Sequence, residues 1–197
     1  MQLIFAAVIT TLGLITDNIV VVIGAMLISP LFWPVMGIAL GIITTRKNIL
    51  KDAAVSFAVS LLLVIFFSTV ITLLVPIDNI APAITARLNT TIIDLFIALA
   101  VSTIGVFALY YPEISATAAG VAISISLLPP LCITGIGLAK WSGPMIGKSL
   151  LLFGTNTGAI VFMGVIVLYL LKIKPKKAEE EVRFRYGILI SGILMIF

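Results

Sequence analysis

Long runs without a charged residue alternate with short polar connections along this chain. The uncharged runs cover residues 19–45, 53–77, 95–112, 114–139 and 149–171. A helix rises about 1.5 Å per residue, so about 20 apolar residues cross the roughly 30 Å hydrocarbon core of a membrane. Strands of a membrane barrel would instead alternate between apolar and polar residues over about ten positions. The runs are continuous, so the pattern predicts transmembrane helices.

The polar connections divide the chain into six complete spans and a partial seventh. The expected spans are residues 2–16, 18–45, 48–76, 91–111, 114–140, 146–172 and 184–197. Residues 1–76 and 91–172 are expected to form two three-helix membrane units, residues 173–185 a charged cytoplasmic loop, and residues 186–197 a partial final helix. The last run is too short to cross a membrane, which indicates either a partial helix or a trimmed end. The expected fold is an all-α polytopic membrane protein.

Composition agrees with this fold class and argues against catalysis. The chain has 197 residues, of which 61% are hydrophobic and 10% are charged. A soluble domain is nearer half apolar and a quarter charged. Histidine is absent, Cys132 is the single cysteine, and neither paired carboxylates at helical spacing nor a phosphate-binding loop is present. We therefore expect no enzyme activity, no cofactor and no bound metal.

The distribution of Lys and Arg predicts the orientation. With a cytoplasmic N-terminus, nine of the twelve basic residues fall in cytoplasmic connections, and only Arg87, Lys140 and Lys148 lie outside. Cytoplasmic loops are enriched in Lys and Arg, and basic residues also attract anionic lipid headgroups. The net positive charge of the chain is therefore explained without a nucleic-acid partner. The expected location is the cytoplasmic (inner) membrane of a prokaryote, with the lipid bilayer as partner.

A weak internal repeat relates the two halves of the chain. Residues 20–39 and 120–139 share seven identical positions of twenty when aligned without gaps. "TTLG" precedes the first segment and "STIG" precedes the second. Weak internal similarity is common in membrane transporters. Because each unit holds three spans, an odd number, the second unit must enter the membrane from the opposite side. This predicts an inverted repeat.

Prolines fall inside both repeated segments. Pro30 and Pro34 lie within the second span, and Pro129 and Pro130 lie within the fifth. Each proline removes a backbone donor and clashes with the preceding turn, so we expect both helices to be broken. Paired broken helices at mid-membrane often mark a solute or ion site, although many proline kinks only tune helix packing.

Polar residues inside the apolar runs are candidate path residues. Asn156 is the one amide in its run, and it must meet another helix, a carbonyl freed by a proline, or a solute. Its neighbour Thr155 and the hydroxyl of Ser29 are further candidates, although Ser and Thr often bond their own helix. Asp94 is expected about one turn inside the fourth span, where an ionisable group indicates function.

The motifs also resemble a known family. "TTLGLITDNIVVVIGAMLISPLFWPVMGIALG", "GVAISISLLPPLCITGIGLA" and "LLLFGTNTGAIVF" are similar in order and spacing to a prokaryotic membrane family, domain of unknown function 389. Members often carry a soluble domain before the membrane part, and we expect none within residues 1–197. The resemblance implies a bacterial or archaeal cytoplasmic-membrane protein and supplies no substrate.

Two functions compete on this sequence. The first is a transporter or channel for a small polar solute or ion, with Pro30, Pro34, Pro129 and Pro130 opening the helices. Its path would be lined by Ser29, Asp94, Thr155 and Asn156. The second is a membrane scaffold or sensor that acts through oligomerisation or through a cytoplasmic partner of residues 172–185. Glycine-rich helix faces favour a homo-oligomer in either case.

Overall fold

The computed structural model describes residues 1–75, 80–88, 91–111, 113 and 116–172. The expected loop at 173–185 and the partial helix at 186–197 lie outside these residues. The described residues form eight helices and no strand. The helices are α1 (Gln2–Ile15), α2 (Ile19–Leu27), α3 (Phe32–Thr44), α4 (Lys47–Leu74), α5 (Pro82–Arg87), α6 (Ile92–Tyr110), α7 (Ala116–Ala139) and α8 (Gly143–Leu170).

Four of these helices are long and apolar enough to cross a membrane: α4, α6, α7 and α8. The pair α2 and α3 meets the same test as one span bent by 55°. α1 has 14 residues, or about 21 Å, which is shorter than the hydrocarbon core. The prediction of six complete spans is therefore wrong for α1, and the described residues hold up to five.

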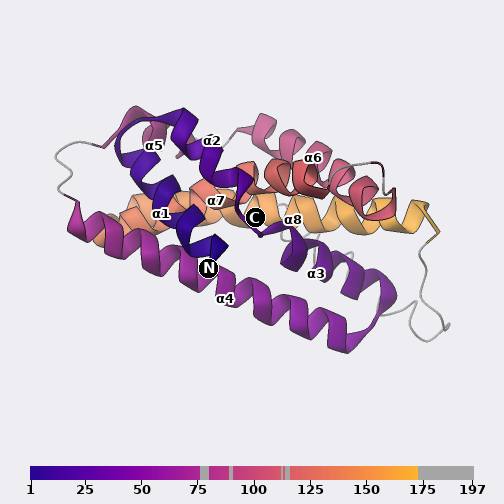
Figure 1. Cartoon of the computed structure of the whole chain (residues 1–197). Coiled ribbons are helices and arrows are strands. Elements are labelled where there is room, and N and C mark those ends of the chain that lie inside the picture. The colour runs from indigo at the N-terminus through magenta and orange to yellow at the C-terminus, as the bar shows by residue number, and fades with distance from the viewer. Residues whose placement is uncertain (76–79, 89–90, 112, 114–115, 173–197) are drawn as a thin grey trace.

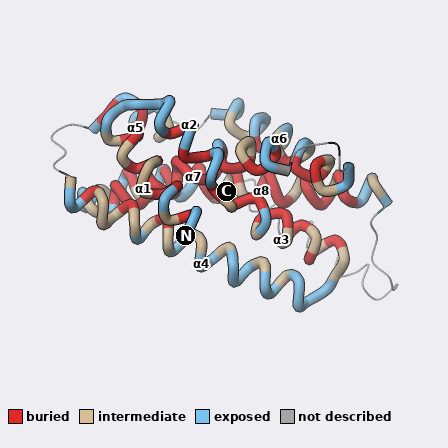
Figure 2. Tube along the Cα trace, in the orientation of Figure 1, coloured by how far each residue is buried: buried red, intermediate tan, exposed pale blue. Residues whose placement is uncertain are grey.

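α7 lies at the centre of the bundle. It packs against α8 and α4 most extensively, and also against α6, α2, α1 and α3. In α7, 78% of the apolar stretch is buried inside the protein, against 17% in α4. Figure 2 shows this contrast, with buried residues concentrated along α7 and exposed residues along the outer side of α4. The exposed side chains of α4 include Leu62, Phe66 and Leu73, as expected for a surface that faces lipid.

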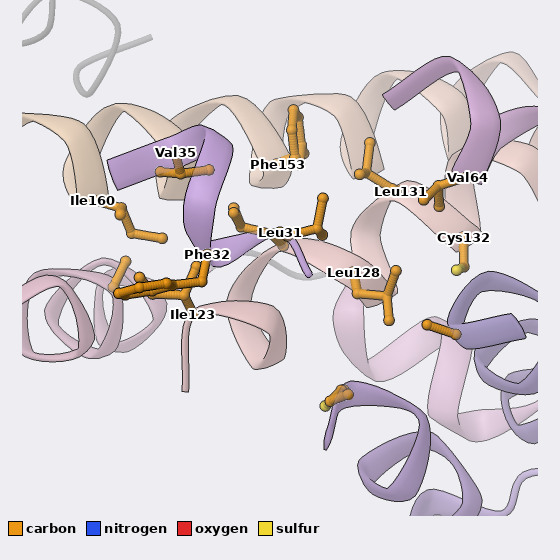
Figure 3. Packing of buried hydrophobic residues seen from close by; sticks show 14 of the residues in the cluster. Leu31, Phe32, Val35, Val64, Ile123, Leu128, Leu131, Cys132, Phe153 and Ile160 are labelled. Carbon is orange, nitrogen blue, oxygen red and sulfur yellow. The ribbon is translucent and has the colours of Figure 1, made fainter. Parts of the chain in front are cut away.

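The two ends of the bundle hold different connections. Figure 1 shows α5 beside the turn between α1 and α2 at one end, and the C-terminal ends of α3 and α8 at the other. We call the first the α5 end and the second the Thr45 end. The N-terminus lies near the middle of the bundle's length. Apolar side chains from α3, α4, α7 and α8 fill the interior between these ends (Figure 3).

The interruption between α2 and α3 spans residues 28–31 and contains Ser29 and Pro30. Proline lacks the backbone donor that a continuous helix would need at this point. Pro34 acts differently from expectation, because it is the third residue of α3. Donors in the first turn of a helix have no partner within the helix, so Pro34 removes no hydrogen bond. The prediction that Pro34 breaks the span again is wrong.

The second predicted break is also wrong. α7 is continuous from Ala116 to Ala139 with Pro129 and Pro130 inside it. Pro130 leaves the carbonyl oxygen of Ser126 without its usual donor four residues later. That oxygen instead accepts a hydrogen bond from Nδ2 of Asn156 on α8, at 3.0 Å. The neighbouring helix thus supplies a donor that the proline cannot, and α7 stays helical at this step.

Small residues set the closest helix approaches. A Cβ added to Gly37 would lie 2.9 Å from Cβ of Ala53, and one added to Gly41 would lie 2.7 Å from Cα of Leu50. These glycines therefore hold α3 against α4, as the small-residue spacing indicates. Gly154 is different, since nothing lies within 4 Å of an added Cβ. Gly154 therefore sets no close approach between helices of the described residues.

The short helix α5 was not predicted, and it is held by a distant carboxylate. Asp17 follows α1 in the left-handed backbone region, with φ 55°. Its Oδ1 accepts a hydrogen bond from the backbone N–H of Ala83 at 2.8 Å, in the first turn of α5. Asn18 caps α2 through the N–H of Val21. Adjacent residues therefore cap two different helices.

The Asp17→Ala variant is expected to release α5 from the bundle. The change removes the acceptor of the Ala83 N–H and places alanine in a left-handed conformation, at a cost of about 1 to 2 kcal/mol. Limited trypsin digestion of the protein in detergent would then cleave faster after Arg87. Asp17→Asn is the matched control, because asparagine tolerates this backbone and keeps an acceptor oxygen. Equal cleavage rates for both variants would contradict this role.

Candidate transport site

Two cavities lie in succession along α7. The first, which we call the Arg87 cavity, has a volume of about 310 Å³. The second, the Ser29 cavity, has a volume of about 300 Å³. Residues lining the Arg87 cavity include Arg87, Asp94, Ile97, Ser126, Pro130 and Asn156. Residues lining the Ser29 cavity include Gln2, Ser29, Pro30, Trp33, Thr117 and Gly120.

Asn156 lines the Arg87 cavity and bonds to α7 just before its pair of prolines. Its side chain is 4% exposed, and Nδ2 is used in the bond to the carbonyl of Ser126. Its Oδ1 is buried and has no hydrogen-bond partner among the described residues. A buried acceptor without a partner costs about 1 to 3 kcal/mol, so this atom favours a bound water or solute in the cavity.

Asp94 lies nearer the end of its helix than the sequence indicated. It is the third residue of α6 and forms a capping box with Thr91. Its Oδ2 accepts hydrogen bonds from the backbone N–H of Thr91 at 2.7 Å and from Oγ1 of Thr91 at 2.9 Å. Asp94 is half-buried and also lines the Arg87 cavity. It therefore both caps α6 and belongs to the candidate site.

Sequence reasoning missed Arg87, which it treated only as a loop charge. The residue ends α5, and its Nη1 donates to the carbonyl oxygen of Ala83 at 3.0 Å. Burial lowers the pKa of the Arg87 guanidinium from its usual range. Among the described residues it is the one basic side chain that lines either cavity, and with Asp94 it brings opposite charges to the same cavity. The sequence signal that could have identified Arg87 is a lone arginine in a short connection between two apolar runs.

Ser29 lines the Ser29 cavity and, like Asn156 in the Arg87 cavity, carries a buried polar atom without a partner among the described residues. Its side chain is 7% exposed, and the unpartnered atom is its Oγ. Its carbonyl oxygen accepts a hydrogen bond from Oγ of Ser124 at 3.4 Å. Ser124 comes after the α7 residues that line the Ser29 cavity and before those that line the Arg87 cavity, so its contact with Ser29 lies between the two cavities along α7.

Three predicted path residues fall outside both cavities. Pro34 is half-buried in the first turn of α3, and Pro129 is buried within α7. Oγ1 of Thr155 bonds the carbonyl oxygens of Leu151 and Leu152 on its own helix, at 3.0 Å each. This is the usual alternative for a threonine within a helix. The structure therefore does not bring Pro34, Pro129 or Thr155 to the site.

The described residues contain no group of three or more Cys, Asp or Glu side chains placed to hold a metal ion. The chemistry available at the two cavities is therefore that of a guanidinium, a carboxylate, an amide and several hydroxyl groups.

Long apolar helices with lipid-facing surfaces define a multi-pass membrane protein. Residues 26–162 match the family described as domain of unknown function 389, and the chain belongs to that family. It is 27% identical over its whole length to an uncharacterised protein of Methanocaldococcus jannaschii. The chain spans 62% of the length of that relative. No solved structure matches the chain.

Proposed function

We propose that this protein passes a small polar solute or ion across the cytoplasmic membrane of a prokaryote through the Arg87 and Ser29 cavities. The observation that carries the proposal is the placement of two cavities in series along α7, each with a deeply buried polar atom without a partner. In a bundle surrounded by lipid, such atoms favour water or solute at those positions.

The order of the cavities suits a path between the two ends of the bundle. Along α7, the Ser29 cavity is lined at residues 117–121 and the Arg87 cavity at residues 125–130. Arg87 places its cavity towards the α5 end, whereas Thr117, at the start of α7, places the other towards the Thr45 end. Ser124 and Ser29 meet between them. We propose that this contact is the constriction of the path.

The proposal includes an inverted repeat that relates α1 to α4 with α6 to α8. Two triplets of small residues support it. Ser68 of α4 receives a hydrogen bond from Thr11 of α1 and lies against Gly135 of α7. In the same way, Gly164 of α8 lies against Ser102 of α6 and Ala39 of α3.

The two triplets correspond element by element, because α4 and α8 both have 28 residues and Ser68 and Gly164 are each the 22nd residue of their helix. Inverted repeats of this kind build many transporters around a site at the repeat interface. Because Arg46, Lys47, Lys51 and Lys172 lie at the Thr45 end, the bias of Lys and Arg favours a cytoplasmic location for that end in this proposal.

Cysteine accessibility tests the proposed path without knowledge of the solute. Single cysteines at Ser29 and Ser126, in a Cys132→Ala background, are expected to react with a membrane-impermeant thiol reagent. Cys132 is the one cysteine of the sequence, so its replacement eliminates the native thiol. We expect Ser126→Cys to react from the α5 side of sealed vesicles and Ser29→Cys from the opposite side.

Leu128→Cys is the matched control, since this position on α7 is fully buried and lines neither cavity. It should not react from either side. If both cavity cysteines are as unreactive as Leu128→Cys, the cavities are closed to water and the path is refuted.

A further inference from the structure

The charges of the Arg87 cavity define the class of solute, an inference that rests on the proposed function. We propose that the cavity binds a small zwitterion that carries one carboxylate and one ammonium group, such as an amino acid with a small side chain. Arg87 would bind the carboxylate, and Asp94 and Asn156 would accept hydrogen bonds from the ammonium group.

The guanidinium of Arg87 has most of its donors available. Of its five N–H groups, one bonds the carbonyl of Ala83, and no other hydrogen bond or ion pair joins this side chain to the described residues. Burial removes part of the hydration of this cation, and no charged side chain among the described residues pairs with it. A carboxylate with two oxygens matches the planar, forked geometry of a guanidinium.

Two other residues of the lining supply acceptors. Oδ1 of Asn156 is buried and unpartnered, and Oδ2 of Asp94 is already used by Thr91. Oδ1 of Asp94 has no hydrogen bond to the described residues. An ammonium group has three donors and no acceptor, so it suits two free acceptor oxygens.

The two opposite charges of the lining favour a zwitterion over a simple ion. A small cation would be attracted by Asp94 but repelled by Arg87, and a small anion would be attracted by Arg87 but repelled by Asp94, in a site where the protein screens charge less than water does. A zwitterion presents the complementary sign to each group and adds no net charge to a site within a membrane. Electrostatic complementarity of this kind gives specificity chiefly by rejecting wrong partners.

The volume of the cavity limits the size of the solute. A cavity of about 310 Å³ has room for roughly ten water-sized volumes. This accommodates glycine, alanine or serine together with some water. The apolar side chains of Ile97 and Leu152 also line the cavity and offer a surface to a short aliphatic side chain.

Isothermal titration of the full chain in detergent tests this assignment, with alanine, acetate and methylamine as probes. We expect alanine to bind at least tenfold more tightly than either of its charged fragments. Arg87→Gln and Asp94→Asn are each expected to weaken alanine binding at least tenfold. Asp94→Asn keeps an oxygen for the cap of α6 while removing the charge. Arg46→Gln is the matched control, since Arg46 is exposed and distant from the cavity, and should bind alanine as the unmodified chain does.

Three results would overturn the zwitterion assignment. The first is acetate or methylamine binding as tightly as alanine. The second is no alanine binding at tens-of-millimolar concentration, and the third is alanine binding that Arg87→Gln leaves unchanged. Flux measurements in vesicles separate this inference from the proposed function. Flux of another solute without alanine binding would refute only the zwitterion, and alanine binding without flux of any solute would refute only the passage.

Discussion

Replacing Asn156 with alanine is expected to lower the free energy of unfolding by about 1 to 2 kcal/mol, and Pro130→Ala should remove most of that cost. The physical reason is the carbonyl of Ser126. In the native chain Pro130 offers it no N–H, so Nδ2 of Asn156 is its donor. Loss of that donor leaves a buried acceptor unsatisfied. Alanine at position 130 restores the backbone N–H within α7, and the amide of Asn156 becomes dispensable for stability.

The measurement is a double-mutant cycle on unfolding in mixed detergent micelles. The coupling free energy between positions 130 and 156 is expected to be about 1 kcal/mol. Leu152→Ala in both backgrounds is a suitable control, because Leu152 lies one turn before Asn156 and makes no hydrogen bond through its side chain. If Asn156→Ala costs the same with and without Pro130, the amide does not replace the donor that the proline removes.

Gly135→Val is expected to have the largest effect on folding of any single substitution considered. A Cβ at position 135 would lie 2.5 Å from Cβ of Ser68 and 2.7 Å from the carbonyl oxygen of Ile65. The second contact is to backbone, which cannot rotate aside, so α7 and α4 would have to move apart. Even alanine should cost about 1 to 3 kcal/mol by overpacking. Valine should prevent recovery of folded protein from the membrane fraction.

Gly154→Val and Gly154→Ala are the matched controls, because an added Cβ there meets nothing within 4 Å. Alanine at position 154 is expected to be neutral or mildly stabilising, since alanine favours helix over glycine by about 1 kcal/mol. The comparison is made on the yield and melting temperature of purified protein. Similar losses at positions 135 and 154 would mean that the α4–α7 contact does not limit folding.

The long helices could be predicted from sequence because their signal is local. The spans expected at residues 48–76 and 91–111 correspond to α4 (Lys47–Leu74) and α6 (Ile92–Tyr110). The length and continuous apolarity of such a segment are enough to identify it as a membrane-spanning helix, and its neighbours in the fold need not be known. The same is true of the Asn18 cap, which acts within three residues.

The features that escaped prediction depend on contacts between distant parts of the chain. Pro129 and Pro130 look like a break until Asn156, some 30 residues away, supplies a donor to Ser126. The six-residue helix α5 is capped by Asp17 across 66 residues. Arg87 belongs to the site only because α5 is held there. The place of Asn156 could be predicted in outline, since a lone amide in lipid must find a partner, and one expected partner was a carbonyl freed by a proline.

Solute flux into sealed vesicles tests the central claim most directly. Purified protein would be reconstituted into liposomes, and entry of labelled amino acids, sugars and inorganic ions would be followed against protein-free liposomes. We expect at least one small polar solute to enter faster with the protein present, and Asn156→Leu to reduce that rate at least tenfold while the variant remains reconstituted. If every solute enters at the protein-free rate, or if the rate is the same with leucine at position 156, the two cavities along α7 are not a path across the membrane.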